Sequence, residues 1–223
     1  MIDLILLSAG LGSRMGLGYP KQFARLRGKP LLIHTLEIFR ASSRIDKIIL
    51  SVRWEFLSKY RELFEIYGTK NLVLVEGGDT RQESVKFCLE EVTAPRVMIH
   101  EAARPFITEQ FIDSLLQIEA DVVVPVLPIS FAVCEIGTRR KIDKSNLRNI
   151  QLPQVFDTRK LKLAHSRVQE VFDEDSVLVY RDDPLNSIIF VDGLEENIKI
   201  TTPLDLKIAE VLYNERHGID NRG

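Results

Sequence analysis

The chain has 223 residues, of which 45% are hydrophobic and 28% charged, a balance typical of a globular protein with one sizeable core. Its net charge of −2 argues against nucleic acid or a membrane surface as a general partner, so any anion site must be a local cluster of cations. We therefore expect a single domain over residues 1–223 that binds a small anionic substrate.

Cysteine usage and the first residues suggest a compartment. Cys88 and Cys134 lie far apart without the spacing of a metal site, which predicts free thiols in a reducing compartment. Asp3 interrupts the first apolar run and no basic segment precedes it, so we expect no signal peptide. No apolar run reaches the ~18 residues of a transmembrane helix. The cytoplasm is the expected location.

Strand patterns alternate with helical patterns along the chain. Strands are expected at Ile2–Leu7, 47–52, 72–75, 96–99, 121–126 and 188–191, and helices at 30–39, 54–67, 82–92, 109–118, 158–168 and 203–212. The segment 176–180 is ambiguous, and the tail 214–223 is expected to fray. Helical connections between strands favour βαβ units, so the pattern predicts an α/β fold with a largely parallel sheet covered on both faces.

The alternation breaks between residues 127 and 154. A polar turn within 136–143 joins two short extended runs and predicts a hairpin with no helix to cover it. We expect a β-arm over about 129–155 that leaves the sheet and packs on a second subunit. A surface hairpin folded on its own domain is the alternative.

The first strand opens into a glycine-rich loop. Three glycines and two cations fall in or just after it: Gly10, Gly12, Gly16, Arg14 and Lys21. The glycines permit a positive φ and close approach of the backbone to a ligand, and the cations would lie beside a polyphosphate. Met15 occupies the third glycine position of the dinucleotide fingerprint, and no Walker A lysine follows. The loop predicts a phosphate site; a tight strand-to-helix turn is the alternative.

Further polar loops follow other predicted strands, and in parallel sheets ligands bind beyond the carboxyl ends of the strands. Gly77-Gly78 precede a predicted helix and would close over a base and sugar, whereas Asp79 or Thr80 would serve equally well as a helix cap. Gln151 to Gln154 form another such loop.

Two more polar loops, 100–105 and 195–202, carry charged residues. Glu101 and Arg104 would orient hydroxyls or a metal ion, or would simply pair with each other, whereas His100 reads as structural. Lys199 precedes the final helix and can face the same crevice as the glycine-rich loop. The cations beside these loops suit a phosphoryl transition state stabilised by electrostatics. A phosphate monoester nucleophile needs no general base, because its second pKa is about 6.

Seven motifs, in register from residue 2 to about 212, resemble the 2-C-methyl-D-erythritol 4-phosphate cytidylyltransferase family. They are Leu7-Ser8-Ala9-Gly10 to Met15-Gly16, Pro20-Lys21-Gln22-Phe23, Gly28-Lys29-Pro30, Gly77-Gly78 to Arg81 with Ser84-Val85, Glu101-Ala102-Ala103-Arg104-Pro105-Phe106, Pro153-Gln154, and Asn197-Ile198-Lys199-Ile200-Thr201-Thr202-Pro203. The resemblance implies a Rossmann-like nucleotidyltransferase that forms a homodimer through a protruding β-arm. It also implies a reaction that joins CTP and methylerythritol phosphate into the CDP-alcohol and releases pyrophosphate, in the non-mevalonate route to isoprenoids, with magnesium on the triphosphate.

The resemblance also implies roles for individual residues. Arg14 and Lys21 would grip the triphosphate and stabilise the pentacoordinate α-phosphate, and Lys199 would bridge the reacting phosphates. The nucleotide would be bound by Ser8, Ala9, Gly10, Gly12, Gly78, Asp79 and Ser84. Within this set, the backbone near Ser8, Ala9, Gly78 and Asp79, together with Ser84, would read cytosine. Glu101, a possible magnesium ligand, and Arg104 would hold the hydroxyls of the sugar alcohol. Lys144 on the arm would contact the acceptor phosphate in the partner's site.

The chain departs from the family pattern on the acceptor side. Glu101 stands where aspartate is usual, Lys144 where arginine is usual, Leu152 and Phe172 where threonines are expected, and Ile129-Ser130 where the family has an Asp-Thr pair. The sister family that activates ribitol 5-phosphate is therefore an alternative, although Ala103 favours the methylerythritol enzyme. A catalytically silent nucleotide-binding protein is a second alternative. A dinucleotide-dependent oxidoreductase is a third, disfavoured by the lack of a strict G-x-G-x-x-G.

Overall fold

The computed structural model describes residues 1–68 and 70–219. Its main strands are β1 (Ile2–Leu7), β4 (Ile45–Val52), β5 (Leu72–Glu76), β6 (Arg96–Glu101), β7 (Val122–Pro128), β10 (Arg148–Ile150), β11 (Gln154–Asp157) and β12 (Ile188–Asp192). Its helices are α1 (Leu31–Ala41), α2 (Leu57–Tyr67), α3 (Arg81–Glu90), α4 (Glu109–Leu116), α5 (Thr158–Arg167), α6 (Asp175–Asp182) and α7 (Pro203–His217). Two small hairpins join β2 (Arg25–Leu26) to β3 (Lys29–Pro30) and β8 (Val133–Glu135) to β9 (Arg140–Ile142).

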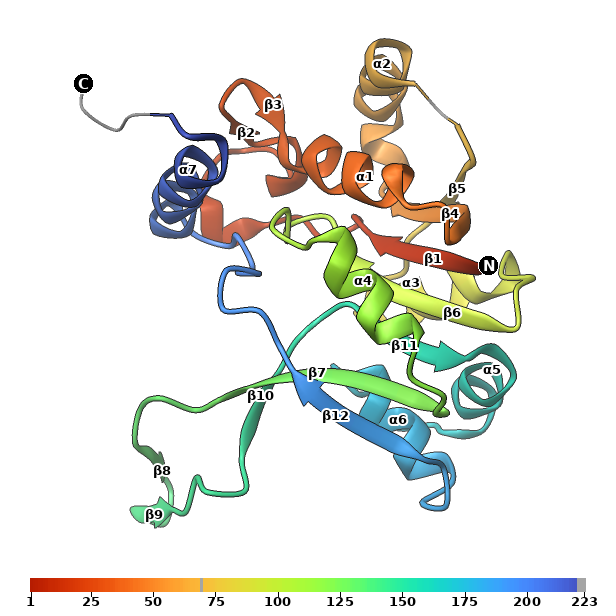
Figure 1. Cartoon of the computed structure of the whole chain (residues 1–223), viewed down its shortest axis with the longest axis vertical. Coiled ribbons are helices and arrows are strands. Elements are labelled where there is room, and N and C mark those ends of the chain that lie inside the picture. The colour runs from red at the N-terminus through yellow and green to blue at the C-terminus, as the bar shows by residue number, and fades with distance from the viewer. Residues whose placement is uncertain (69, 220–223) are drawn as a thin grey trace.

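The main strands form one eight-stranded mixed sheet at the centre of the molecule (Figure 1). The order is β10-β7-β11-β6-β1-β4-β5, with β12 paired to β7. β1 pairs in parallel with β4 and β6, β4 with β5, and β7 with β12. The expected largely parallel sheet is confirmed, with two exceptions that the sequence pattern did not reveal: β11 runs antiparallel between β6 and β7, and β10 pairs antiparallel with β7.

Two hydrophobic cores lie on opposite faces of this sheet. In β1, Leu4 and Leu6 pack into one core with α1, α2 and α4, and Ile5 packs into the other with α3, α5 and α6. This division follows from the strand geometry, because successive side chains of a strand point to opposite faces. The predicted α/β architecture with helices on both faces therefore agrees with the structure.

The hairpin of β8 and β9 projects away from the sheet (Figure 1). The sequence places this arm over about 129–155, whereas the chain already rejoins the sheet at Arg148, where β10 pairs with β7. The excursion is therefore shorter, because β10 and β11 pair with β7 and extend the main sheet.

The ambiguous segment 176–180 lies in helix α6. The tail was expected to fray from Asn214, but α7 continues to His217 and Gly218 closes it in the left-handed conformation, so that expectation is wrong for 214–217. Residues 220–223 of the same tail lie outside the described part of the chain. The start of α7 is as expected, since Thr202 caps it, Pro203 is its first residue and Asp205 completes a capping box. None of the helices within residues 1–68 and 70–219 is long and apolar enough to cross a bilayer.

Candidate active site

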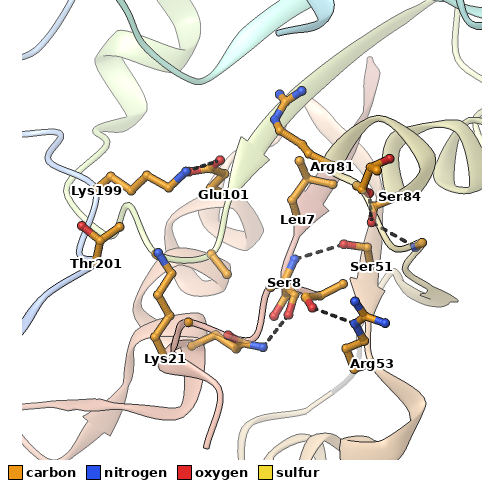
Figure 2. Close-up of a pocket in the computed structure, with 18 of the residues that line it drawn as sticks. Leu7, Ser8, Lys21, Ser51, Arg53, Arg81, Ser84, Glu101, Lys199 and Thr201 are labelled. Atoms are coloured by element: carbon orange, nitrogen blue, oxygen red, sulfur yellow. Dashed lines mark hydrogen bonds and ion pairs between the residues drawn. The ribbon is translucent and has the colours of Figure 1, made fainter. Parts of the chain in front are cut away.

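Loops at the carboxyl ends of β1, β4 and β6 enclose a cavity of about 300 Å³ (Figure 2). Eleven of the residues predicted from the sequence line it: Ser8, Ala9, Gly10, Gly12, Arg14, Lys21, Gly78, Asp79, Ser84, Glu101 and Lys199. They come from segments distant in sequence, which meet because parallel strands end at the same edge of the sheet.

Gly12 brings the glycine-rich loop against the turn that carries Lys21. Gly12 adopts a φ of +66°, and a Cβ there would lie 2.9 Å from the main-chain nitrogen of Lys21. Gly16 also has a positive φ, whereas Gly10 does not, and both have open space where a Cβ would lie. Met15 anchors the loop, because its buried side chain packs in a third core cluster.

Ser8 is held by a buried polar cluster. Its carbonyl accepts hydrogen bonds from Gln22 Nε2 and from the Tyr60 hydroxyl, and its N–H donates to Ser51 Oγ at 3.1 Å. Both main-chain polar groups of Ser8 are therefore engaged inside the protein, so Ser8 shapes the loop. Burial raises the pKa of Tyr60 to about 12. No motif around Tyr60 or Ser51 marked them in the sequence; only tertiary packing brings them to Ser8.

Lys21 and Lys199 approach the cavity from opposite ends of the chain. Lys21 Nζ donates to the carbonyl of Ile200 at 2.9 Å, and Lys199 Nζ lies 2.8 Å from Glu101 Oε1. Burial, and then the nearby Lys199 and Arg14, lower the pKa of Lys21 to about 8. The Arg14 side chain is exposed at the cavity rim. The cavity thus places Arg14, Lys21 and Lys199 near the carboxylate of Glu101.

Glu101 and Arg104 form a pair, as one reading of the sequence expected, but Glu101 also contacts a second cation. Arg104 Nε lies 3.6 Å from Glu101 Oε2, and its Nη1 donates to the Asn197 carbonyl at 2.9 Å. Arg104 is not among the residues that line the cavity. Burial alone would raise the pKa of Glu101, but Lys199 and Arg104 outweigh it and lower the pKa to about 2. His100 is buried, its Nε2–H donates to the Arg104 carbonyl at 3.0 Å, and burial lowers its pKa to about 4.

The wall that follows β5 is braced internally. The Gly78 N–H donates to Ser84 Oγ at 3.1 Å, and Ser84 Oγ donates to the Thr80 carbonyl at 3.0 Å. Thr80, not Asp79, caps α3. The Asp79 side chain is 94% exposed and lies 3.5 Å from Arg53 Nη1.

Two arginines of the cavity wall had no role assigned from the sequence. Arg53 Nε donates to the Ala9 carbonyl at 3.2 Å and so links two walls of the cavity (Figure 2). Its position directly after β4 was a usable signal, because ligands bind beyond strand ends. Arg81 follows the Gly77-Gly78 pair and is held by an ion pair to Asp175 at 2.6 Å.

Three residues on the expected acceptor side lie away from the cavity lining. Lys144 Nζ donates to the carbonyls of Ile129 and Ser130 on its own arm, at 2.9 and 2.8 Å. Leu152 is buried in the second core, and Phe172 packs against that core. The two positions where the family has threonines therefore contribute apolar packing here.

The residues present fit magnesium held chiefly by a nucleotide. Among residues 1–68 and 70–219, no three His, Cys, Asp or Glu side chains gather as an all-protein metal site would require. Glu101 Oε2 is buried and has no hydrogen-bond partner among the described residues. One carboxylate together with substrate phosphates and water is the donor set that magnesium commonly takes.

The fold and the site together define a Rossmann-like nucleotidyltransferase. The profile of the family IspD, 2-C-methyl-D-erythritol 4-phosphate cytidylyltransferase, matches residues 2–215, and the chain belongs to this family. The cytidylyltransferase of that name from Bacteroides fragilis is 37% identical over 93% of this chain and 97% of its own length.

Two other relatives match over nearly all of this chain. A bifunctional IspD/IspF enzyme of Wolbachia pipientis is 32% identical over 96% of this chain, which spans only 56% of that enzyme. The crystal structure of 4-diphosphocytidyl-2C-methyl-D-erythritol synthase from Anaerococcus prevotii superposes with a TM-score of 0.85, at 25% identity and over 96% of both chains.

Proposed function

We propose that this chain transfers a cytidylyl group from CTP to 2-C-methyl-D-erythritol 4-phosphate, giving CDP-methylerythritol and pyrophosphate in non-mevalonate isoprenoid biosynthesis. The observation that carries the proposal is that Arg14, Lys21 and Lys199 line one cavity at the end of β1. The reaction brings a phosphate dianion toward a triphosphate, so it needs concentrated positive charge. Membership of the cytidylyltransferase family supports CTP as the nucleotide.

In the proposed reaction an oxygen of the acceptor phosphate attacks the α-phosphorus of CTP. The new P–O bond forms as the bond to the β-phosphate breaks, and both electrons of that bond leave with pyrophosphate. Arg14 and Lys21 would stabilise the charge on the pentacoordinate α-phosphate, and Lys199 would bridge the reacting phosphates. Such preorganised charges supply most of the rate in phosphoryl transfer.

The nucleotide would lie along the loops that carry Ala9, Gly10 and Gly12. Gly78, Asp79 and Ser84 would form the wall that reads cytosine, and selection at the exocyclic amine would exclude uracil. Ser8 would act by fixing the loop, since its main-chain groups are already hydrogen-bonded to Gln22, Tyr60 and Ser51.

Glu101 and Arg104 would hold the acceptor's hydroxyls. Magnesium, when bound by the triphosphate with Glu101 as its protein ligand, would neutralise phosphate charge. The anionic state of Glu101 suits both roles, because Lys199 and Arg104 hold its pKa near 2 against the effect of burial.

The arm would join two chains in a homodimer. Phe131 and Ile136 on the arm are 85% and 83% exposed, and large apolar side chains exposed together favour an interface. In the dimer, Lys144 would reach the acceptor phosphate in the partner's site. The free thiols and low net charge are consistent with a cytoplasmic enzyme.

The proposal is tested by pyrophosphate release from the purified chain with magnesium and one nucleotide at a time. We expect release with CTP and methylerythritol 4-phosphate, and at most a few per cent of that rate with UTP or ATP. Ribitol 5-phosphate is the matched acceptor control, because Leu152 and Phe172 remove hydroxyls from the acceptor side. Release with ribitol phosphate alone would contradict the acceptor and keep the chemistry, and silence with both acceptors would contradict the activity.

A further inference from the structure

Arg81 is a partly buried cation in a position that helix stability disfavours. It is the first residue of α3, where the helix dipole presents its positive end. Its side chain is only 19% exposed, and removing a guanidinium from water costs free energy even when it is paired. An uncharged residue would serve stability better at this place, which points to a role in binding.

Asp175 and His165 fix the position of this guanidinium from two other helices. Asp175 Oδ2 lies 2.6 Å from Arg81 Nη1, and Asp175 Oδ1 lies 3.1 Å from His165 Nε2. Both partners are fully enclosed, Asp175 at the start of α6 and His165 in the last turn of α5. Burial alone would raise the pKa of Asp175, but Arg81 and His165 lower it, so the carboxylate stays charged at neutral pH.

The guanidinium of Arg81 lies at the same end of the cavity as Glu101 (Figure 2). Its Nη2 is buried and has no hydrogen-bond partner among the described residues. Arg104 Nε and Glu101 Oε2 also lack a hydrogen bond, because the 3.6 Å between them is an ion-pair contact longer than a hydrogen bond. The three residues act on one another electrostatically. Buried polar atoms are rarely left unpaired, and such a cluster of donors and one acceptor matches a ligand rich in hydroxyl groups.

We propose that Arg81 Nη2 donates a hydrogen bond to a hydroxyl of the sugar-alcohol acceptor, and that Asp175 and His165 are positioning residues for Arg81. The inference rests on the proposed function and extends its acceptor site beyond Glu101 and Arg104. It also accounts for acceptor binding without hydroxyl side chains at 152 and 172, because charged donors take over the contact.

The test compares Asp175→Asn, which keeps the shape of the side chain and removes its charge, with Asp121→Asn. Asp121 forms an ion pair of the same 2.6 Å length with Lys160 and does not line the cavity. For Asp175→Asn we expect the KM for methylerythritol 4-phosphate to rise about tenfold or more, because a charge-assisted hydrogen bond loses its geometry. The Kd of CTP, measured by calorimetry without acceptor, should stay within about twofold.

Asp121→Asn should leave both constants unchanged. Arg81→Lys, which keeps the charge and loses the fork, should reproduce the rise in acceptor KM and serves if Asp175→Asn does not fold. An unchanged acceptor KM, or an equal loss of acceptor and CTP affinity, would overturn the inference. A purely structural role would lower only the melting temperature. A wild-type chain that binds CTP and turns over neither acceptor would overturn the proposed function and this inference together.

Discussion

Lys21 combines a buried position with a charge that the proposed reaction requires. Burial and the neighbouring Lys199 lower its pKa from 10.5 to about 8, so the ammonium group is close to losing its proton in mildly alkaline solution. Its contact with the Ile200 carbonyl fixes the nitrogen at the cavity wall. A positive charge in a partly desolvated site stabilises a charged transition state more than the same charge in water does.

We expect kcat/KM for CTP to fall about tenfold per pH unit above pH 8, because the free enzyme then loses the charge on Lys21. The variant Lys21→Arg should lack this fall up to pH 9, since an arginine stays protonated. The measurement is a pH profile of pyrophosphate release between pH 6 and pH 9.

The sign of the stability effect separates this loss from unfolding. The lowered pKa means that the unfolded chain binds the proton more tightly, so Lys21 contributes increasing stability as pH rises from about 8 toward 10.5. The melting temperature should therefore not drop in step with activity between pH 8 and pH 9. A parallel drop would contradict the assignment of the profile to Lys21.

The glycine-rich loop is the element whose conformation sets the place of Lys21. Gly12 and Gly16 have nearly the same positive φ, +66° and +65°, but only at Gly12 would a side chain meet Lys21. Substituting each of these two glycines therefore distinguishes the cost of the left-handed conformation from the effect of a contact with the turn that carries Lys21.

We expect Gly16→Ala and Gly12→Ala each to lose about 1–2 kcal/mol of stability from the left-handed conformation. Gly12→Ala should in addition lower kcat/KM by about 10²-fold, because displacing a catalytic group by about 1 Å has this order of effect. Chemical denaturation and steady-state kinetics measure the two effects. Equal kinetic losses in the two variants would show that the Gly12 contact does not position Lys21.

At the scale of the whole molecule, we propose that the arm joins two chains. We expect the wild type to sediment as a dimer at micromolar concentration, and the double variant Phe131→Ser, Ile136→Ser to weaken the dimer about 10²-fold or more. Each large apolar side chain that is buried contributes about 1.5–3 kcal/mol to association. In a dimer with two-fold symmetry, each substitution removes two such side chains from the interface. Ile66→Ser on α2, where the side chain is 66% exposed, is the control and should leave the dimer intact. A wild-type monomer would contradict the assembly.

The sheet and most helices follow from local patterns in the sequence, because apolar alternation and helix caps such as Thr202 act over a few residues. β11 could not be predicted this way, since its antiparallel place between β6 and β7 depends on long-range pairing. The extension of α7 to His217 was hidden by the polar composition of its last turn.

The cavity was predictable in so far as its residues follow strands or glycine pairs, as Arg14, Lys21 and Glu101 do. Tyr60 and Asp175 gave no such signal, because each lies on a helix and acts through a partner in another segment. The packing of Leu152 in the second core and of Phe172 against it could not be read from the motif, which records the residue type and not the direction of the side chain.

The contact between Lys21 and Ile200 joins residues 179 positions apart, and Ile200 in turn donates to the Ala103 carbonyl. On a ribosome that adds about 5–20 residues per second, the two ends of this contact emerge roughly 10–40 s apart. For that interval a nascent chain can assemble β1, β4 and β6 while Lys21 lacks its anchor and Lys199 has not been made. In the proposed mechanism the nascent chain is therefore inactive until Lys199 has been added and Lys21 has its anchor at Ile200.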